Sequence, residues 1–288
     1  MTWLKRLILP AAILSLAAAP ITAVADGAAT PVASGSPVEQ AGAPMPANVA
    51  QLDAALTAKD YATLNRVHGD IRTFNDILLF MNWEQVRVFN GEGGVYLSLL
   101  YMGDLWTLAS AMEKAGPSRA SQAADMKQTS VFMGLYSYEL IVLDGSKCTD
   151  STAVGHRMDQ LIADHPDTWA YIPQIPEEMR AKMVWAALTL ETHTAPARRN
   201  DDVLCQGGMT QMIAGLAEQA RSGQAPQEVP NRPGVIGKSY AVAPPKDFQI
   251  GYASPDVWRP QQAKLREAMP ARLAEIMKVK APYAPPKP

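Results

Sequence analysis

Hydrophobic residues recur every three or four positions through most of the chain after residue 47, and runs that alternate apolar with polar residues are nearly absent. The first period is typical of amphipathic α-helices, whereas alternation is typical of half-buried strands. We therefore predict an all-α fold, either an irregular multi-helix bundle or an array of helical hairpins. Strands, where they occur, are expected only as short pieces in the C-terminal third.

Residues that favour helix ends divide the pattern into separate helices. Asp60 can cap a short helix that ends at Gly69, so that residues 47–69 form a helical hairpin. Further helices are predicted over 73–89, 93–116 (one helix, or two joined at Gly103), 117–145, 151–163 and 176–192, and from Gly208 onward.

One predicted helix is apolar on nearly all sides. Its second half, from Val131 to Leu143, carries large apolar residues around the whole circumference and includes Glu139. A helix of this kind usually lies at the buried centre of a bundle, and this one is too short to cross a membrane. We expect the other helices to pack around it.

The N-terminus has the pattern of a secretory signal peptide. Lys5 and Arg6 precede an apolar run from Leu7 to Ala19, and small residues follow up to Ala25. A retained membrane anchor is the alternative, but a spanning helix needs about 20 apolar residues. We predict cleavage after Ala25 and a periplasmic or secreted protein with no transmembrane segment in the mature chain.

Composition divides the remaining chain into segments. The stretch 224–260 is rich in proline, which forbids any long helix there, yet it carries too many large apolar side chains for a free linker. We expect it to be an extended arm that packs on the domain. The predicted segments are a signal peptide (1–25), a flexible Ala/Pro/Gly/Ser linker (26–46), a helical domain (47–223), the arm (224–260), a C-terminal helix with a kink near Pro270 (261–279) and a tail (280–288).

The two cysteines, Cys148 and Cys205, each lie at a predicted helix end. In an oxidising compartment two cysteines without a metal usually pair, so we predict a disulfide between them. A nucleophilic thiol would need a base such as His156 folded against it, and a zinc site would need more ligands at suitable spacing.

The charge of the chain argues against one class of partner. The net charge is −2, and the charged residues form no block of one sign. Proteins that bind nucleic acids usually carry a clustered basic face, so no nucleic-acid partner is expected.

Two acids inside apolar helical runs, Asp104 and Glu139, are the candidates for catalysis. Carboxyl groups forced into a cleft can act as general acid and base, although each could instead pair with a base such as Arg87 or Lys127. Aromatic side chains nearby would suit a small organic ligand if they lined the same cavity. The candidate binding residues are Tyr96, Tyr101, Trp106, Tyr136 and Tyr138.

No strong motif for a metal, cofactor or nucleotide is present. His156, Asp159, His165 and His193 could supply ligands in principle, but His165 precedes a proline in a turn, His193 suits a helix end, and neither H-E-x-x-H nor the paired E-x-x-H arrangement of di-iron bundles is present. The sequence GVIGKS lacks the glycine that a phosphate loop requires, because that position is Arg232. We therefore predict no metal and no cofactor.

These patterns favour binding over catalysis. We expect an exported helical module that binds a protein or small-molecule partner in the cell envelope, or that serves as a scaffold. The alternatives are a hydrolase-like envelope enzyme that lacks a familiar motif and uses acids in a helical cleft, and a structural subunit of an envelope assembly.

Overall fold

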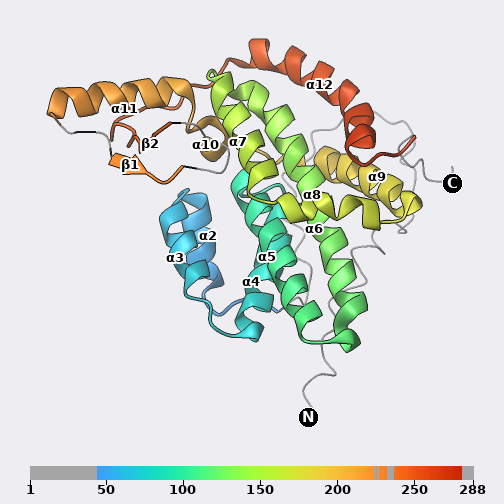
Figure 1. Cartoon of the computed structure of the whole chain (residues 1–288). Helices are drawn as coiled ribbons and strands as arrows, with labels where there is room; N and C mark the ends of the chain where they lie inside the picture. The colour runs from blue at the N-terminus through green and yellow to red at the C-terminus, as the bar shows by residue number, and fades with distance from the viewer. Residues whose placement is uncertain (1–43, 224, 226, 232–236, 281–288) are drawn as a thin grey trace. The chain divides into compact units, whose positions relative to one another are not determined.

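The computed structural model describes residues 44–223, 225, 227–231 and 237–280. The predicted signal peptide, most of the predicted linker and the tail after residue 280 lie outside these residues. As predicted, the described part of the chain is all-α apart from one small hairpin (Figure 1). The helices are α2 (Val49–Thr57), α3 (Tyr61–Gly69), α4 (Phe74–Phe89), α5 (Gly94–Lys114), α6 (Ala120–Asp144), α7 (Ser151–Ala163), α8 (Pro166–Ala170), α9 (Glu177–Thr194), α10 (Asp202–Cys205), α11 (Met209–Ser222) and α12 (Pro255–Ile276); 3₁₀ turns cover Pro117–Arg119, Gly145–Lys147 and Ile172–Gln174.

Helices α5 and α6 form a long antiparallel hairpin whose contact is lined by small residues. The Ser137 hydroxyl donates to the Ser98 hydroxyl at 3.0 Å, and the Ser130 hydroxyl donates to the Met102 carbonyl at 2.9 Å. All three serines are fully buried, and each hydroxyl donates to a partner within the hairpin, that of Ser98 to the Val95 carbonyl, so these small polar residues allow the two backbones to approach closely. Helix α5 is continuous through Gly103, where a break was one of two expectations.

Helix α6 is the buried central helix that its sequence predicts. It packs against α5, α7, α8, α9 and α12, and its residues from Ser130 to Asp144 are almost all buried. A β-carbon at Gly134 would lie 3.1 Å from the Trp169 ring and 3.2 Å from the Met102 sulfur, so only glycine fits here without displacing neighbours. None of the helices in the described part of the chain is both long and apolar enough to cross a membrane.

The predicted N-terminal hairpin is present as α2 and α3. The Asp60 carboxylate caps α3 by accepting the Thr63 N–H at 3.0 Å, and Leu52 and Leu64 bury one face of the pair. The last residues of the predicted linker are also fixed, because the Asn82 amide donates to the Pro44 carbonyl at 3.1 Å.

The C-terminal helix differs from the prediction. Helix α12 begins at Pro255, not at 261, and it includes Pro260 and Pro270. Pro255 occupies the first turn, where a missing N–H costs nothing, and each internal proline removes only one backbone hydrogen bond. Buried Met269 and Leu273 pack the helix against the core, and this packing compensates for the lost bonds.

The described part of the Pro-rich arm contacts the helical domain. Strands β1 (Gln227–Val229) and β2 (Ser239–Ala241) pair antiparallel, with Glu228 opposite Tyr240. Further along, the Gly251 carbonyl accepts from the Thr149 N–H at 3.1 Å, and the Ala253 N–H donates to the Lys147 carbonyl at 2.8 Å.

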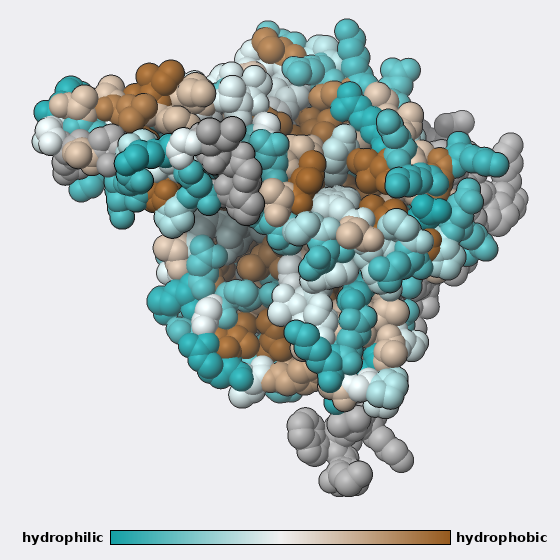
Figure 2. Space-filling model, viewed as in Figure 1, coloured by the Kyte–Doolittle hydropathy of each residue, from teal (hydrophilic) through white to brown (hydrophobic). Residues whose placement is uncertain are grey.

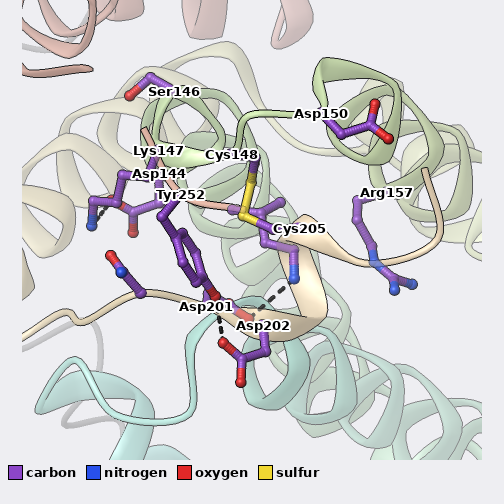
Figure 3. Close-up of a disulfide and its surroundings, with 12 residues drawn as sticks. Asp144, Ser146, Lys147, Cys148, Asp150, Arg157, Asp201, Asp202, Cys205 and Tyr252 are labelled. Atoms are coloured by element: carbon purple, nitrogen blue, oxygen red, sulfur yellow. Dashed lines mark hydrogen bonds and ion pairs between the residues drawn. A yellow bond between two sulfur atoms is a disulfide. The ribbon is translucent and has the colours of Figure 1, made fainter. Parts of the chain in front are cut away.

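A disulfide joins Cys148 and Cys205, as predicted from the sequence; their α-carbons are 5.2 Å apart (Figure 3). It connects the segment after α6 to α10 across 57 positions of sequence. Tyr252 of the arm lies beside the disulfide, and its hydroxyl donates to Asp202. The sulfurs are therefore bonded to each other, and neither is available as a thiol nucleophile or a metal ligand.

We predict that replacing both cysteines by alanine lowers the free energy of unfolding by about 2–4 kcal/mol, because the cross-link restricts the unfolded chain. Thermal and urea unfolding of the native and double-variant proteins measure this loss. Reductant should shift only the native protein, so the double variant is the control. Intact-mass analysis of unreduced, alkylated protein should show no label, and a label on both sulfurs would contradict the disulfide.

Candidate functional site

Asp104 lies at the centre of a partly buried polar cluster formed by α3, α4 and α5. The Nε2 atom of His68, at the end of α3, is 3.0 Å from both carboxylate oxygens of Asp104. His68 is partly exposed and its ring packs against Phe80, with the two centroids 5.3 Å apart. The hydrogen bond to Asp104 raises the pKa of His68, although partial burial opposes this effect.

Glu84 of α4 is a neighbour of Asp104 and is fully buried. No N–H or O–H group of another described residue donates to its carboxyl oxygens, but the side chain lies within hydrogen-bonding reach of Asp104. Burial, and next the negative charge of Asp104, raise the pKa of Glu84 well above its ordinary value. Burial thus favours the neutral form of Glu84, next to the hydrogen-bonded pair of His68 and Asp104.

Glu139 belongs to a different cluster, formed where α6, α9 and α12 meet. It is fully buried with both oxygens unpartnered, and burial, followed by the charge of Glu191, raises its pKa well above its ordinary value. No hydrogen bond or ion pair in the described part of the chain joins Glu139 to Asp104. The structure thus separates the two acids that sequence analysis offered as an acid–base pair.

Arg198 organises the cluster near Glu139. Its side chain is only 3% exposed, and its guanidinium donates to Asp144 at 2.7 Å and to Glu191 at 2.5 Å. Arg266 of α12 also binds Glu191, at 2.8 Å, and Lys147 binds Asp144 at 2.9 Å. Burial raises the pKa of Glu191, but the hydrogen bonds from Arg266 and Arg198 outweigh burial and leave this pKa lowered.

The five aromatic candidates do not share one site. Tyr96 and Tyr101 lie near Glu84. Burial is the main cause that raises the pKa of both hydroxyls, and the charge of Glu84 is the second; the pKa of Tyr96 is raised to about 12. Trp106 packs edge-on against Tyr171, with Lys127 4.9 Å above its ring. Tyr136 bonds to Thr194 at 2.9 Å near Arg198, and Tyr138 is half-buried against the core.

The two bases considered as partners for the candidate acids are occupied elsewhere. Arg87 binds Asp53 at 2.6 Å, and Lys127 binds Glu113 at 2.6 Å. Sequence analysis did not single out His68, the actual partner of Asp104, because the two residues are 36 positions apart on different helices. Among the described residues, no group of three or more His, Cys, Asp or Glu side chains is arranged to hold a metal ion.

The most distinctive surface feature lies on α11. Met209, Met212, Ile213 and Leu216 are 51%, 44%, 59% and 41% exposed, although they are large apolar residues. Figure 2 shows hydrophobic residues gathered on the outward side of this helix. The sequence predicts this helix and the spacing of its apolar residues, but it does not show whether a neighbour covers them. We call these four residues the α11 face.

Helix α11 is held firmly at its base. The Asp150 carboxylate accepts the Thr210 N–H at 2.8 Å and also caps α7 by accepting the Thr152 N–H at 3.0 Å. The Thr152 hydroxyl accepts the Met209 N–H at 2.7 Å. Gly215, on the side of α11 away from its exposed face, lies so close to Val242 and Ala243 that a β-carbon would meet the Ala243 carbonyl at 2.5 Å.

Comparisons of the chain with protein-family models, curated protein sequences and solved structures find no match. We therefore infer function from the contacts and exposed surfaces of this chain alone.

We predict that Arg198→Met lowers the free energy of unfolding by about 3–5 kcal/mol, because it leaves Asp144 and Glu191 buried with fewer partners. Arg266→Met is the matched control: its side chain is 39% exposed and Glu191 keeps Arg198, so the loss should stay below about 1 kcal/mol. Urea unfolding measures both. Equal losses in the two variants would show that Arg198 is not the centre of the cluster.

We predict that Glu84→Gln flattens the pH dependence of stability above pH 4.5, the ordinary pKa of this group. Because the folded-state pKa is raised, the unfolded chain releases the proton first, so native stability falls as pH rises, by at most about 1.4 kcal/mol per pH unit. Glutamine has a similar shape and cannot ionise. Urea unfolding at several pH values between pH 5 and pH 8 tests this.

His68→Gln is the control for that experiment. The raised pKa of His68 contributes stability that is present below its ordinary pKa of 6.5 and is lost as pH rises through the folded-state value. This variant should therefore flatten only the neutral-to-alkaline part of the curve, and Glu84→Gln should also affect the acidic part. Parallel curves for native protein and Glu84→Gln would mean that Glu84 is already ionised in the fold.

Proposed function

We propose that this chain is an exported helical binding module, and that the α11 face holds an amphipathic helix of a partner polypeptide. The uncovered α11 face, on a helix fixed at its base, carries this proposal. Two observations support export. The first 25 residues have the order of a signal peptide, with basic residues first, then an apolar run, then small residues up to Ala25; and the disulfide suits an oxidising compartment.

The spacing of the α11 face matches a helical partner. Met209, Met212, Ile213 and Leu216 stand at positions i, i+3, i+4 and i+7, and thus form one stripe along the helix. Such a stripe packs well against the corresponding stripe of another helix, side chains of one filling the spaces of the other. Met209 and Met212 add flexible side chains that adapt to the shape of the partner.

Charge defines the chemistry of the partner. The α11 face contains no ionisable residue, and Glu218 and Arg221 near the end of the helix pair with each other at 2.5 Å. A partner therefore gains from apolar contact and gains little from charge. Helices that lie on membranes usually carry several lysines or arginines on their polar face, but Arg221 is the only basic residue of α11. A polypeptide thus fits this surface better than a lipid bilayer.

We predict that the protein binds a fluorescein-labelled, uncharged amphipathic peptide of about 18 residues with leucine at i, i+3, i+4 and i+7. Ile213→Glu should weaken binding at least about tenfold, because the new carboxylate would be buried in the contact. Fluorescence anisotropy of the labelled peptide, with the protein titrated through the micromolar range, measures binding.

Ser222→Glu is the matched control. It adds the same charge to the same helix, but residue 222 follows residue 213 by nine positions and so lies on the opposite side. Native binding by Ser222→Glu together with weakened binding by Ile213→Glu would support the proposal. Equal binding by all three proteins, or no binding by the native protein, would contradict it. Co-sedimentation of the native protein, but not of Ile213→Glu, with lipid vesicles would show that the face binds membrane instead.

A further inference from the structure

The imidazole ring of His68 binds a carboxylate through one nitrogen and leaves the other nitrogen free. Nε2 lies 3.0 Å from both oxygens of Asp104, and a carboxylate can only accept, so the neutral ring carries its proton on Nε2 and a lone pair on Nδ1. The described part of the chain offers Nδ1 no hydrogen bond, and Nδ1 is not one of its buried, unpartnered polar atoms. With the side chain 29% exposed, this basic lone pair is accessible to solvent.

Glu84, behind Asp104, has no cationic partner that would explain its burial. It is fully buried, forms no ion pair within the described part of the chain, and has Asp104 within hydrogen-bonding reach. Burying a carboxyl group without a cation costs free energy. Neighbouring carboxyl groups in such different surroundings are typical of sites that transfer protons.

The three side chains form a series from the interior to the surface. Glu84 is fully buried, the Asp104 side chain is 11% exposed, and the His68 side chain is the most exposed of the three. A carboxylate that orients one ring nitrogen, while the other nitrogen can reach a reactant, is the usual arrangement of a histidine general base. Asp104 would also stabilise the imidazolium that forms when Nδ1 takes a proton.

An N–H donor lies one helical turn from this base. Asn65 and His68 are three positions apart on α3 and therefore share a side of the helix. The Tyr96 hydroxyl donates to the Asn65 side-chain oxygen at 2.8 Å, and the Asn65 amide N–H groups have no partner among the described residues. Tyr61 packs against Tyr96, with the ring centroids 4.7 Å apart. A base beside an amide donor suits an acyl compound, whose carbonyl oxygen becomes negative when water adds to it.

We propose that His68 is the general base of an ester-hydrolysing site between α3 and α5, with Asp104 as its positioning residue. Nδ1 takes a proton from water while the water oxygen bonds to the acyl carbon, and the Asn65 amide donates to the carbonyl oxygen. The imidazolium then gives that proton to the alkoxy oxygen as the ester C–O bond breaks. A carboxylic acid and an alcohol leave, and His68 is neutral again. This site is independent of the α11 face and does not rest on the proposed function.

Hydrolysis of p-nitrophenyl acetate, followed as release of p-nitrophenolate, tests the site. His68→Gln should lower kcat/KM at least about tenfold, because general-base catalysis typically contributes a factor of about 100 or more. His193→Gln is the matched control, since His193 is an exposed histidine outside the cluster, and it should keep the native rate. Equal rates for native protein and His68→Gln overturn the proposal, as does an equal loss in both variants. Circular dichroism checks that each variant is folded.

The pH profile separates a base from a merely structural histidine. The native rate should rise with a midpoint above 6.5, because Nδ1 must be unprotonated and the hydrogen bond to Asp104 raises the pKa of His68. Asp104→Asn removes this effect, so its midpoint should move to lower pH and kcat should fall. A midpoint that Asp104→Asn does not move overturns the role of Asp104.

Glu84 of α4 and Tyr96 of α5 are the other titratable groups of the cluster. Burial is the main cause that raises the pKa of each, that of Tyr96 to about 12. Glu84→Gln cannot ionise at this position, so a rate that still rises above pH 6.5 in this variant assigns the titration to His68. Disappearance of the rise in Glu84→Gln would assign it to Glu84 and overturn the proposed base.

Discussion

The buried guanidinium of Arg198 is the interaction on which the arrangement of the C-terminal helices depends. It binds Asp144 at the end of α6 and Glu191 in the last part of α9, and Glu191 in turn holds Arg266 of α12. Apolar packing is non-directional and is compatible with several helix arrangements. A planar guanidinium that binds two carboxylates is compatible with far fewer helix arrangements. The ends of α6 and α9 and the path of α12 are thus fixed by directional bonds inside an otherwise apolar contact.

The buried acids show how differently an apolar core can treat the same side chain. Two arginines bind Glu191 and lower its pKa, whereas Glu139, close by, has no hydrogen-bond partner among the described residues and burial raises its pKa. The same contrast occurs at the other cluster, where Asp104 pairs with His68 and burial raises the pKa of Glu84. A carboxyl group in a helix interior is therefore not in itself a sign of chemistry. Its partners decide its charge.

Much of the fold could be predicted from the sequence because local rules set it. Caps such as Asp60, the period of apolar residues and the apolar circumference of α6 all act within a few turns of helix. The start of α12 was mispredicted because tertiary contacts near it outweigh the local cost of Pro260: the Lys147 amine lies 5.4 Å from the centre of the Trp258 ring, and buried Gln262 donates to Leu143 and Asp144. Helix propensity is a weak guide where burial is strong.

The candidate site was harder to predict, for a related reason. The sequence marks Asp104 and Glu139 as unusual, but the pairing of Asp104 with His68 depends on how α3 packs against α5. The α11 face shows the same limit: its spacing was visible, yet spacing alone does not say whether a neighbour covers the face. The disulfide was predictable because the sequence holds only two cysteines, each at a predicted helix end, and because the predicted export would favour their oxidation.

The shared cap at Asp150 has a further consequence for how the molecule opens. One carboxylate holds the first N–H groups of both α7 and α11, which are about sixty residues apart in sequence. Partial burial raises the pKa of Asp150, but the hydrogen bonds from Thr152 and Thr210 outweigh it and leave this pKa lowered, so the cap persists into mild acid. A β-carbon at Gly208 would lie 2.4 Å from this carboxylate, so only glycine allows the approach. Loss of this one carboxylate would therefore leave the first N–H groups of both helices without their cap at the same time.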